Sequence, residues 1–97
     1  MPIADDRLTP QQRRDRDVRR QALAAVLRAA RTERGWTQAQ LAERAGLSRH
    51  AILRLEAGTA TISVDALFQI AAALGTTPSA LLSAVEADPA TAETLKP

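Results

Sequence analysis

The sequence contains no cysteine and no tyrosine, and it has a single histidine, a single tryptophan and a single phenylalanine. Without cysteine, neither a disulfide bond nor a thiolate metal site can stabilise the fold. The lone histidine, His50, lacks the partners that a metal centre or a hydrolytic triad requires. We therefore expect no cofactor and no enzymatic activity, and we expect stability to come from packing alone.

Long apolar runs are also missing from the chain. No segment approaches the roughly 18 apolar residues that are needed to cross a bilayer. Residues 1–6 do not combine a basic region with a following apolar region, as a signal peptide would. These absences predict a cytoplasmic protein that has no membrane partner.

Alanine, leucine and arginine dominate the composition, and β-branched residues never alternate in the manner of a strand. This composition predicts an all-α fold. The 97 residues provide room for a single domain. A domain of this size buries only about 60% of its unfolded surface, so its core is expected to be small.

Positive charge is concentrated in the first half of the chain. Residues 13–54 hold eleven arginines against four acidic residues, a balance of +7, whereas residues 59–97 hold one lysine against four acidic residues, a balance of −3. A basic half attracts a polyanion, and nucleic acid is the obvious candidate. A solvated, salt-bridged surface would have the same balance, so charge alone leaves both interpretations open.

The N-terminal third is predicted to form one long helix. Residues 1–8 are polar and aperiodic, which indicates a disordered arm. Residues 9–12 combine a capping box with a proline at the first helical position, and the helix that they start is expected to end at Gly35. Its arginine-rich first part, residues 9–22, forms an extension that either continues as one rod or breaks near residues 18–22.

Four shorter helices are predicted to follow, each with a side-chain cap at its start. They are residues 38–44, 49–57 and 64–74 and a helix that begins at Pro78 and stops before Pro89, capped by Thr37, Ser48, Ser63 and Thr77. Together with the end of the long helix they form a domain over residues 23–86. Residues 87–97 are polar and are expected to be a disordered tail.

The tight turn between the second and third of these five helices predicts a helix-turn-helix over residues 38–57. Ala42 lets the two helices approach closely, and Gly46 supplies the left-handed conformation of the turn. Leu47 and Ile52 hold the third helix against the body of the domain. Four side chains of that helix then face outward: Arg49, His50, Leu53 and Arg54.

Four stretches carry a recognisable pattern. They are RAARTERGWTQAQLA over residues 28–42, AGLSR over 45–49, ILRLEAG over 52–58 and IAAALG over 70–75. Together they resemble the lambda-repressor-like, or XRE, helix-turn-helix family, and the resemblance covers residues 23–83 without a gap. It implies a compact five-helix DNA-binding domain and a bacterial transcriptional regulator of the repressor type, bound to double-stranded DNA in the nucleoid.

The resemblance also implies roles for individual residues. Family members read base edges with the residues that follow the cap of the third helix, here Arg49, His50, Leu53 and Arg54. The residues expected to meet phosphate are Thr37, Gln38, Ser48, Thr59 and Thr61, the last two standing where the family often has lysine or arginine. Arg31 and Glu56 match a pair that ties the first helix to the end of the third.

A single recognition helix contacts too few base pairs to be selective in a genome. We therefore expect a homodimer on an inverted-repeat operator, with half-sites centred roughly 34 Å apart. Leu82 and Val85 are the candidate interface residues, and an apolar seam of the first helix over residues 18–29 is the alternative. All of these side chains could instead close the core of a monomer.

A protein-binding function remains an alternative. The same fold would serve as an antitoxin or adaptor whose main partner is another protein. The seam over residues 18–29 could receive a partner helix, although its alanines also suit helix formation alone. The arginines of residues 13–20 could likewise follow the DNA backbone, but their spacing around the helix favours a solubilising surface.

Overall fold

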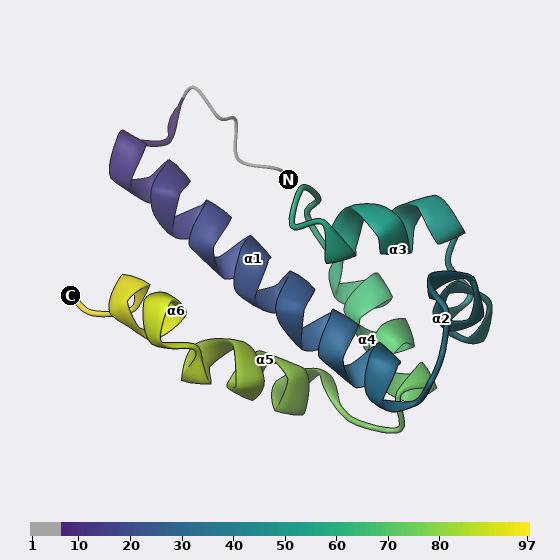
Figure 1. Ribbon diagram of the computed structural model, residues 1–97. Helices are drawn as coiled ribbons and strands as arrows, with labels where there is room; N and C mark the ends of the chain where they lie inside the picture. Colours follow the sequence, from purple (N-terminus) through teal and green to yellow (C-terminus); the bar gives the residue numbers. More distant parts are fainter. Residues whose placement is uncertain (1–6) are drawn as a thin grey trace.

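The structure, a computed structural model, describes residues 7–97 and contains no strand within them. Its helices are α1 (Pro10–Glu33), α2 (Gln38–Ala45), α3 (Arg49–Glu56), α4 (Val64–Ala73), α5 (Pro78–Ala87) and α6 (Pro89–Thr94) (Figure 1). The predicted all-α fold is therefore confirmed, with one helix more than expected. Most of the predicted disordered arm, residues 1–6, lies outside the described residues.

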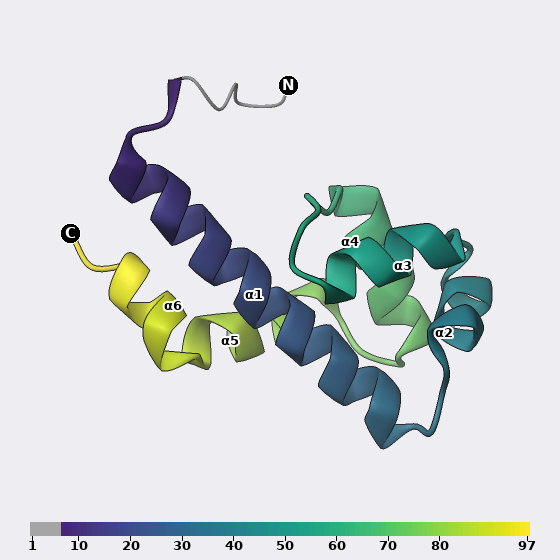
Figure 2. The ribbon, with the colours of Figure 1, turned by 45° about the horizontal axis from the view of Figure 1, so that its top comes forward.

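The long helix α1 is a single uninterrupted rod, with no break near residues 18–22. Its start is a complete capping box, in which Thr9 Oγ1 accepts from Gln12 N at 3.0 Å and Gln12 Oε1 accepts from Thr9 N at 2.8 Å. No glycine or proline interrupts the helix before Gly35, so every backbone hydrogen bond along it can form. The rod crosses the molecule, with α2–α4 at its C-terminal end and α5–α6 along its side (Figures 1 and 2).

The core lies where α1 meets α2, α3 and α4. Its largest fully buried side chains are Leu27, Leu41, Ile52 and Ile70, one from each of these helices, and Leu81 of α5 packs against the same cluster. Apolar residues at helical spacing produce this arrangement, because each helix presents one apolar face inward.

Helices α4 and α5 are the more apolar part of the chain. Within residues 7–97 no single helix is long and apolar enough to cross a membrane, and the pair α4 and α5, which together reach that length and composition, is bent by 98° at its break. The apolar residues of α4 are buried at Leu67 and Ile70, as is the C-cap Leu74, but Val64 at the start of the helix is 69% exposed.

The C-terminal segment is a helix, so the disordered tail predicted for residues 87–97 is wrong. Pro89 does stop α5, as expected, but a proline also suits the first position of a new helix. Asp88 adopts an extended conformation and caps α6, its Oδ2 accepting from Thr91 N at 2.9 Å. Arg19 of α1 then donates to Thr94 O and Oγ1 at 3.0 and 2.9 Å, which holds α6 beside α1 (Figure 2).

Gly46 forms the turn between α2 and α3 with a φ of 69°, a left-handed conformation. Leu47 N donates to Ala42 O at 2.9 Å and closes the end of α2. We expect Gly46→Val to lower the free energy of unfolding by about 1–2 kcal/mol, because a side chain at positive φ approaches its own carbonyl group. Ala39→Val, on the exposed side of α2, should cost less than about 0.7 kcal/mol. Thermal melting compares the two, and equal melting temperatures would show that the turn does not need glycine.

Candidate nucleic-acid interface

Helix α3 is amphipathic, and its two faces are well separated. Ile52, Leu55 and Glu56 are buried against the body of the domain. The four side chains predicted to read bases are all exposed, and their spacing places them on one face of the helix: Arg49, His50, Leu53 and Arg54. In residues 7–97 no group of three or more histidine, aspartate or glutamate side chains is placed so that it could hold a metal ion.

The start of α3 is fixed by its own cap and by close packing on α2. Ser48 Oγ accepts from Ala51 N at 3.0 Å. Behind the helix, Ala42 and Ala45 of α2 are 3% and 4% exposed. Methyl side chains at these two positions let α2 and α3 approach closely, because a larger group would force the helices apart. The exposed face of α3 therefore has a defined orientation.

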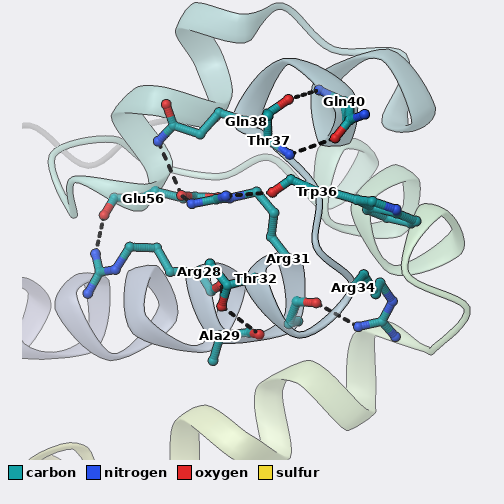
Figure 3. Close-up of polar contacts among 11 residues, drawn as sticks. Arg28, Ala29, Arg31, Thr32, Arg34, Trp36, Thr37, Gln38, Gln40 and Glu56 are labelled. Carbon is teal, nitrogen blue, oxygen red and sulfur yellow. Dashed lines mark hydrogen bonds and ion pairs between the residues drawn. The ribbon is translucent and has the colours of Figure 1, made fainter.

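The end of α3 is tied to α1 by a buried ion pair. Arg31 Nε and Nη2 donate to the two carboxylate oxygens of Glu56 at 2.8 and 2.9 Å, and Glu56 is only 3% exposed (Figure 3). Arg31 Nη1 also donates to Trp36 O at 2.7 Å. Gln38 of α2 completes the cluster, its Nε2 donating to Glu56 Oε1 at 3.2 Å. One carboxylate thus joins α1, α2 and α3 in the pairing that the sequence predicted for Arg31 and Glu56.

The electrostatics of this cluster favour the charged state. The hydrogen bonds to Glu56, and secondarily the negative charge of its carboxylate, raise the pKa of the Arg31 guanidinium above its ordinary value, while burial acts in the opposite direction. The ion pair is therefore present at neutral pH. Arg28 adds a further contact from α1, since it donates to the backbone carbonyl of Glu56.

The N-terminus of α2 presents backbone N–H groups to solvent, as a phosphate-binding helix end does. Thr37 and Gln40 form a capping box there, with contacts of 3.1 and 2.8 Å (Figure 3). Thr37 is exposed and its hydroxyl accepts in this box, so its hydrogen remains free to donate. Gln38 is half-buried, and one of its amide hydrogens is used by Glu56.

The other predicted phosphate contacts differ in what they can offer. Ser48 and Thr61 are exposed, and their hydroxyl groups act as acceptors, from Ala51 N at 3.0 Å and from Arg20 Nη2 at 2.6 Å. Thr59 donates both its N–H and its hydroxyl to Arg54 O, at 3.2 and 3.3 Å. Thr59 is therefore the least available of the predicted phosphate contacts.

A family model described as helix-turn-helix matches residues 27–81, more than half of the chain. The chain belongs to the lambda-repressor-like helix-turn-helix family. The clp gene regulator ClgR from Corynebacterium glutamicum is similar, at 33% identity and a TM-score of 0.65 over 69% of this chain and 71% of that chain. A second ClgR structure has 31% identity and a TM-score of 0.66 over 73% and 92% of the two chains.

A hypothetical transcription factor from Neisseria, NHTF, is also similar to this helix-turn-helix protein. It is 35% identical, with a TM-score of 0.62 over 65% of this chain and 72% of that chain. No curated protein matches the chain.

Sequence reasoning missed several contacts that shape this helix-turn-helix domain. The Trp36 ring is in contact with two guanidinium groups, with Arg44 at 4.3 Å and Arg34 at 5.9 Å from its centre. This stacking helps to fix the turn between α1 and α2. The basic residues at positions 34 and 44 were visible in the sequence, but only the folded turn brings both of them to the ring.

Some of the arginines in residues 13–20 make contacts within the protein, so they neither form a purely solvated surface nor are all available to the DNA backbone. Arg19 contacts Thr94 of α6, and Arg20 contacts Thr61 in the loop after α3. Arg14 bonds to Gln11 on the same helix at 2.9 Å. Two of these arginines therefore connect α1 to distant segments of the chain.

The two candidate dimer residues differ in their exposure to solvent. Val85 is 7% exposed, so it offers little surface to a second copy of the chain. Helix α5, which carries Val85, packs against α1 and α4, and the unexpected helix α6 packs against α1 and α5. Leu82, by contrast, is 43% exposed. Along the alternative seam, Ala22 is buried and Val18 is half-buried, whereas Ala25 and Ala29 are exposed.

Proposed function

We propose that this helix-turn-helix protein is a transcriptional repressor that reads the DNA major groove with α3. The observation that carries the proposal is the exposed face of Arg49, His50, Leu53 and Arg54 on a helix held from behind at both ends. An α-helix fits the major groove, where each base pair presents a distinct set of contacts. The solved structures that resemble the chain include a gene regulator and a hypothetical transcription factor, which supports the same class of function.

Two residues of this face, Arg49 and Leu53, suit particular base contacts, and polar residues beside the face suit phosphate. Arg49 follows the Ser48 cap and can donate two hydrogen bonds to the O6 and N7 atoms of guanine. Leu53 provides an apolar contact for a thymine methyl group. Thr37, Gln38, Ser48 and Thr61 position the helix by donating to phosphate oxygens, which carry no sequence information themselves.

Selection from a random duplex pool, followed by footprinting of the enriched sequence, tests this proposal. The wild-type protein should enrich one motif and protect it, with an affinity that falls as salt rises. The matched control is a variant with Arg49 and Arg54 both replaced by glutamine, which should keep its fold and lose the enrichment. Enrichment of no motif by a folded wild-type protein would contradict the proposal.

The proposed regulator acts as a two-fold dimer on an inverted repeat. With Val85 buried, the seam of α1 over residues 18–29 becomes the expected contact, because its exposed Ala25 and Ala29 would let two α1 helices approach closely. We expect sedimentation at micromolar concentration to give twice the 10.4 kDa protomer mass. Ala25→Glu should give a monomer with weaker operator binding, and Leu82→Glu should remain a dimer.

The opposite result for these two variants would assign the interface to α5. A wild-type monomer that binds one half-site with one-to-one stoichiometry would contradict the dimer itself.

The protein-binding alternative rests on the same seam. A shallow groove beside it is lined by Val18, Ala22 and Ala25 of α1 and by Ala90 of α6, with Asp17 and Asp88 at its edges. If another protein fills that groove, the chain would act as an antitoxin or adaptor and Ala25→Glu would abolish that complex instead of a homodimer. Retention of arginines on the outward face of α3 favours DNA, with the protein in the cytoplasm at the nucleoid.

A further inference from the structure

A second groove lies on the side of α1 that faces α5 and α6. Its volume is about 490 Å³, which is within the size range of small-molecule sites. The walls come from α1, the loop after α3, α5 and α6, and they are mainly apolar: Leu23, Ile62, Leu82, Val85 and Leu95. Leu82 and Leu95 are 43% and 51% exposed, so this apolar surface is open to solvent.

The rim of this groove is positively charged. Arg16, Arg19 and Arg20 line it from α1, and Glu86 is the one acidic residue among the described lining residues. Arg16 is in an ion pair with Asp17 at 3.3 Å, so the charge of the rim comes mainly from Arg19 and Arg20. Arg19 and Arg20 hydrogen-bond to neutral oxygens, those of Thr94 and Thr61. Their charge is therefore not neutralised by these contacts, and an anion at the rim would find two guanidinium groups with donors to share.

A buried polar atom lies in the same place. Thr91 of α6 lines the groove, is 2% exposed, and its Oγ1 has no hydrogen-bond partner within residues 7–97. A buried hydroxyl group without a partner is uncommon in folded proteins, because it loses its hydrogen bonds to water. The unpartnered Thr91 hydroxyl group indicates that the groove takes a ligand, since a purely apolar wall would not need a polar atom there.

We infer that this groove binds a small amphipathic anion, a hydrocarbon chain with a carboxylate head. The chain would lie against Leu23, Ile62 and Leu82, where burial removes apolar surface from water. The carboxylate would accept hydrogen bonds from Arg19 and Arg20 at the rim. A neutral or cationic head would gain nothing from these arginines.

Binding at this site would reach the DNA-facing loop, a step that rests on the proposed function. Arg20 Nη2 donates to Thr61 Oγ1 at 2.6 Å, and Thr61 is one of the proposed phosphate contacts. A carboxylate at the rim would compete with Thr61 for Arg20 and would add negative charge near the DNA. The ligand should therefore weaken operator binding, and DNA should weaken ligand binding by the same factor.

Calorimetric titration of decanoate into the full chain, without DNA, tests the site. We expect saturable one-to-one binding, with decanol bound about tenfold or more weakly because charge-assisted hydrogen bonds are lost. A variant with Arg19→Gln and Arg20→Gln should bind decanoate about tenfold more weakly than the wild type does. Its affinity for decanol should be almost unchanged. The matched control, Arg13→Gln with Arg14→Gln, removes equal charge from α1 away from the groove and should bind decanoate like the wild type.

A second variant keeps the test valid if the double arginine variant unfolds. Leu82→Gln changes an exposed residue of the groove wall and should lower the affinity for decanoate and for decanol by the same factor. The site is overturned if decanoate shows no saturable binding at millimolar concentration, or if both arginine pairs have equal effects. A further outcome would also overturn the site. If Leu82→Gln dissociates a dimer and decanoate does not affect that dimer, the groove is filled by a second copy of the chain.

Operator binding is measured separately, with and without decanoate. Decanoate should lower the affinity for the selected operator by about tenfold. An unchanged affinity in the presence of bound decanoate would overturn the coupling. If the protein selects no DNA, the proposed function fails alone, since the calorimetric titration decides the ligand site without DNA.

Discussion

Replacing Glu56 with alanine is expected to lower the free energy of unfolding by about 3–5 kcal/mol. The carboxylate accepts from Arg31 at 2.8 and 2.9 Å and from Gln38 at 3.2 Å, and it is 3% exposed. Its removal leaves the Arg31 guanidinium, whose side chain is 14% exposed, without its counter-charge. A buried charge without a partner lowers the free energy of unfolding by more than the intact ion pair adds to it.

Urea denaturation measures this loss, and the chain offers a matched control. Glu93 forms an ion pair with Lys96 at 3.0 Å, but both side chains are about 70% exposed. Glu93→Ala should therefore change stability by less than about 1 kcal/mol. Equal losses for the two variants would show that burial of the Arg31–Glu56 pair has no energetic importance.

The pH dependence of this contribution follows from the pKa shift of Arg31. The folded state raises this pKa, so the stabilisation is complete below the ordinary arginine value. It is lost only in strongly alkaline solution, as pH rises through the raised value. The difference between wild type and Glu56→Ala should consequently not decline between neutral and mildly alkaline pH.

Replacing Arg49 with alanine is expected to weaken operator binding by about 1–3 kcal/mol and to relax the preference at one base pair. Arg49 is exposed and is the first residue of α3 after the Ser48 cap. It lies at the N-terminal end of the helix, where recognition helices contact base edges. Because its side chain is exposed, its removal should leave the stability of the domain almost unchanged.

Selections with variant proteins distinguish base reading from simple charge. Arg49→Lys keeps the charge but loses the two-pronged donor geometry, so it should retain salt-dependent binding and still lose the base preference. Arg14→Ala removes one charge from α1, far along the chain from α3, and should leave the motif unaltered. An unchanged motif for Arg49→Ala would remove this residue from the base-reading set.

Much of the helix-turn-helix could be predicted because its signals are local. Thr9, Thr37, Ser48 and Ser63 each cap the helix that follows, through hydrogen bonds to a backbone N–H three residues ahead. Such contacts depend on neighbouring residues alone, so they are visible in a sequence. The outward face of α3 follows in the same way from the spacing of Ile52 and Leu55.

The C-terminal segment illustrates where local reasoning fails. Pro89 stops one helix and starts another, and the sequence does not indicate which effect dominates. The answer depends on Arg19, seventy-five residues before Thr94, which holds α6 against α1. Burial of Val85 and exposure of Leu82 likewise depend on how α5 packs against other helices, which its own residues do not show.

The sequence by itself determined an all-α helix-turn-helix domain with four outward side chains on α3, because caps, glycine turns and apolar periodicity act within a few residues. Only the tertiary structure decided that α1 is continuous, that α6 exists and that an arginine-rimmed groove lies between them. These features depend on contacts such as Arg20 with Thr61, forty-one positions apart. Contacts between residues far apart in the sequence cannot be predicted from local preferences, because those preferences do not determine which surfaces of the folded chain pack together.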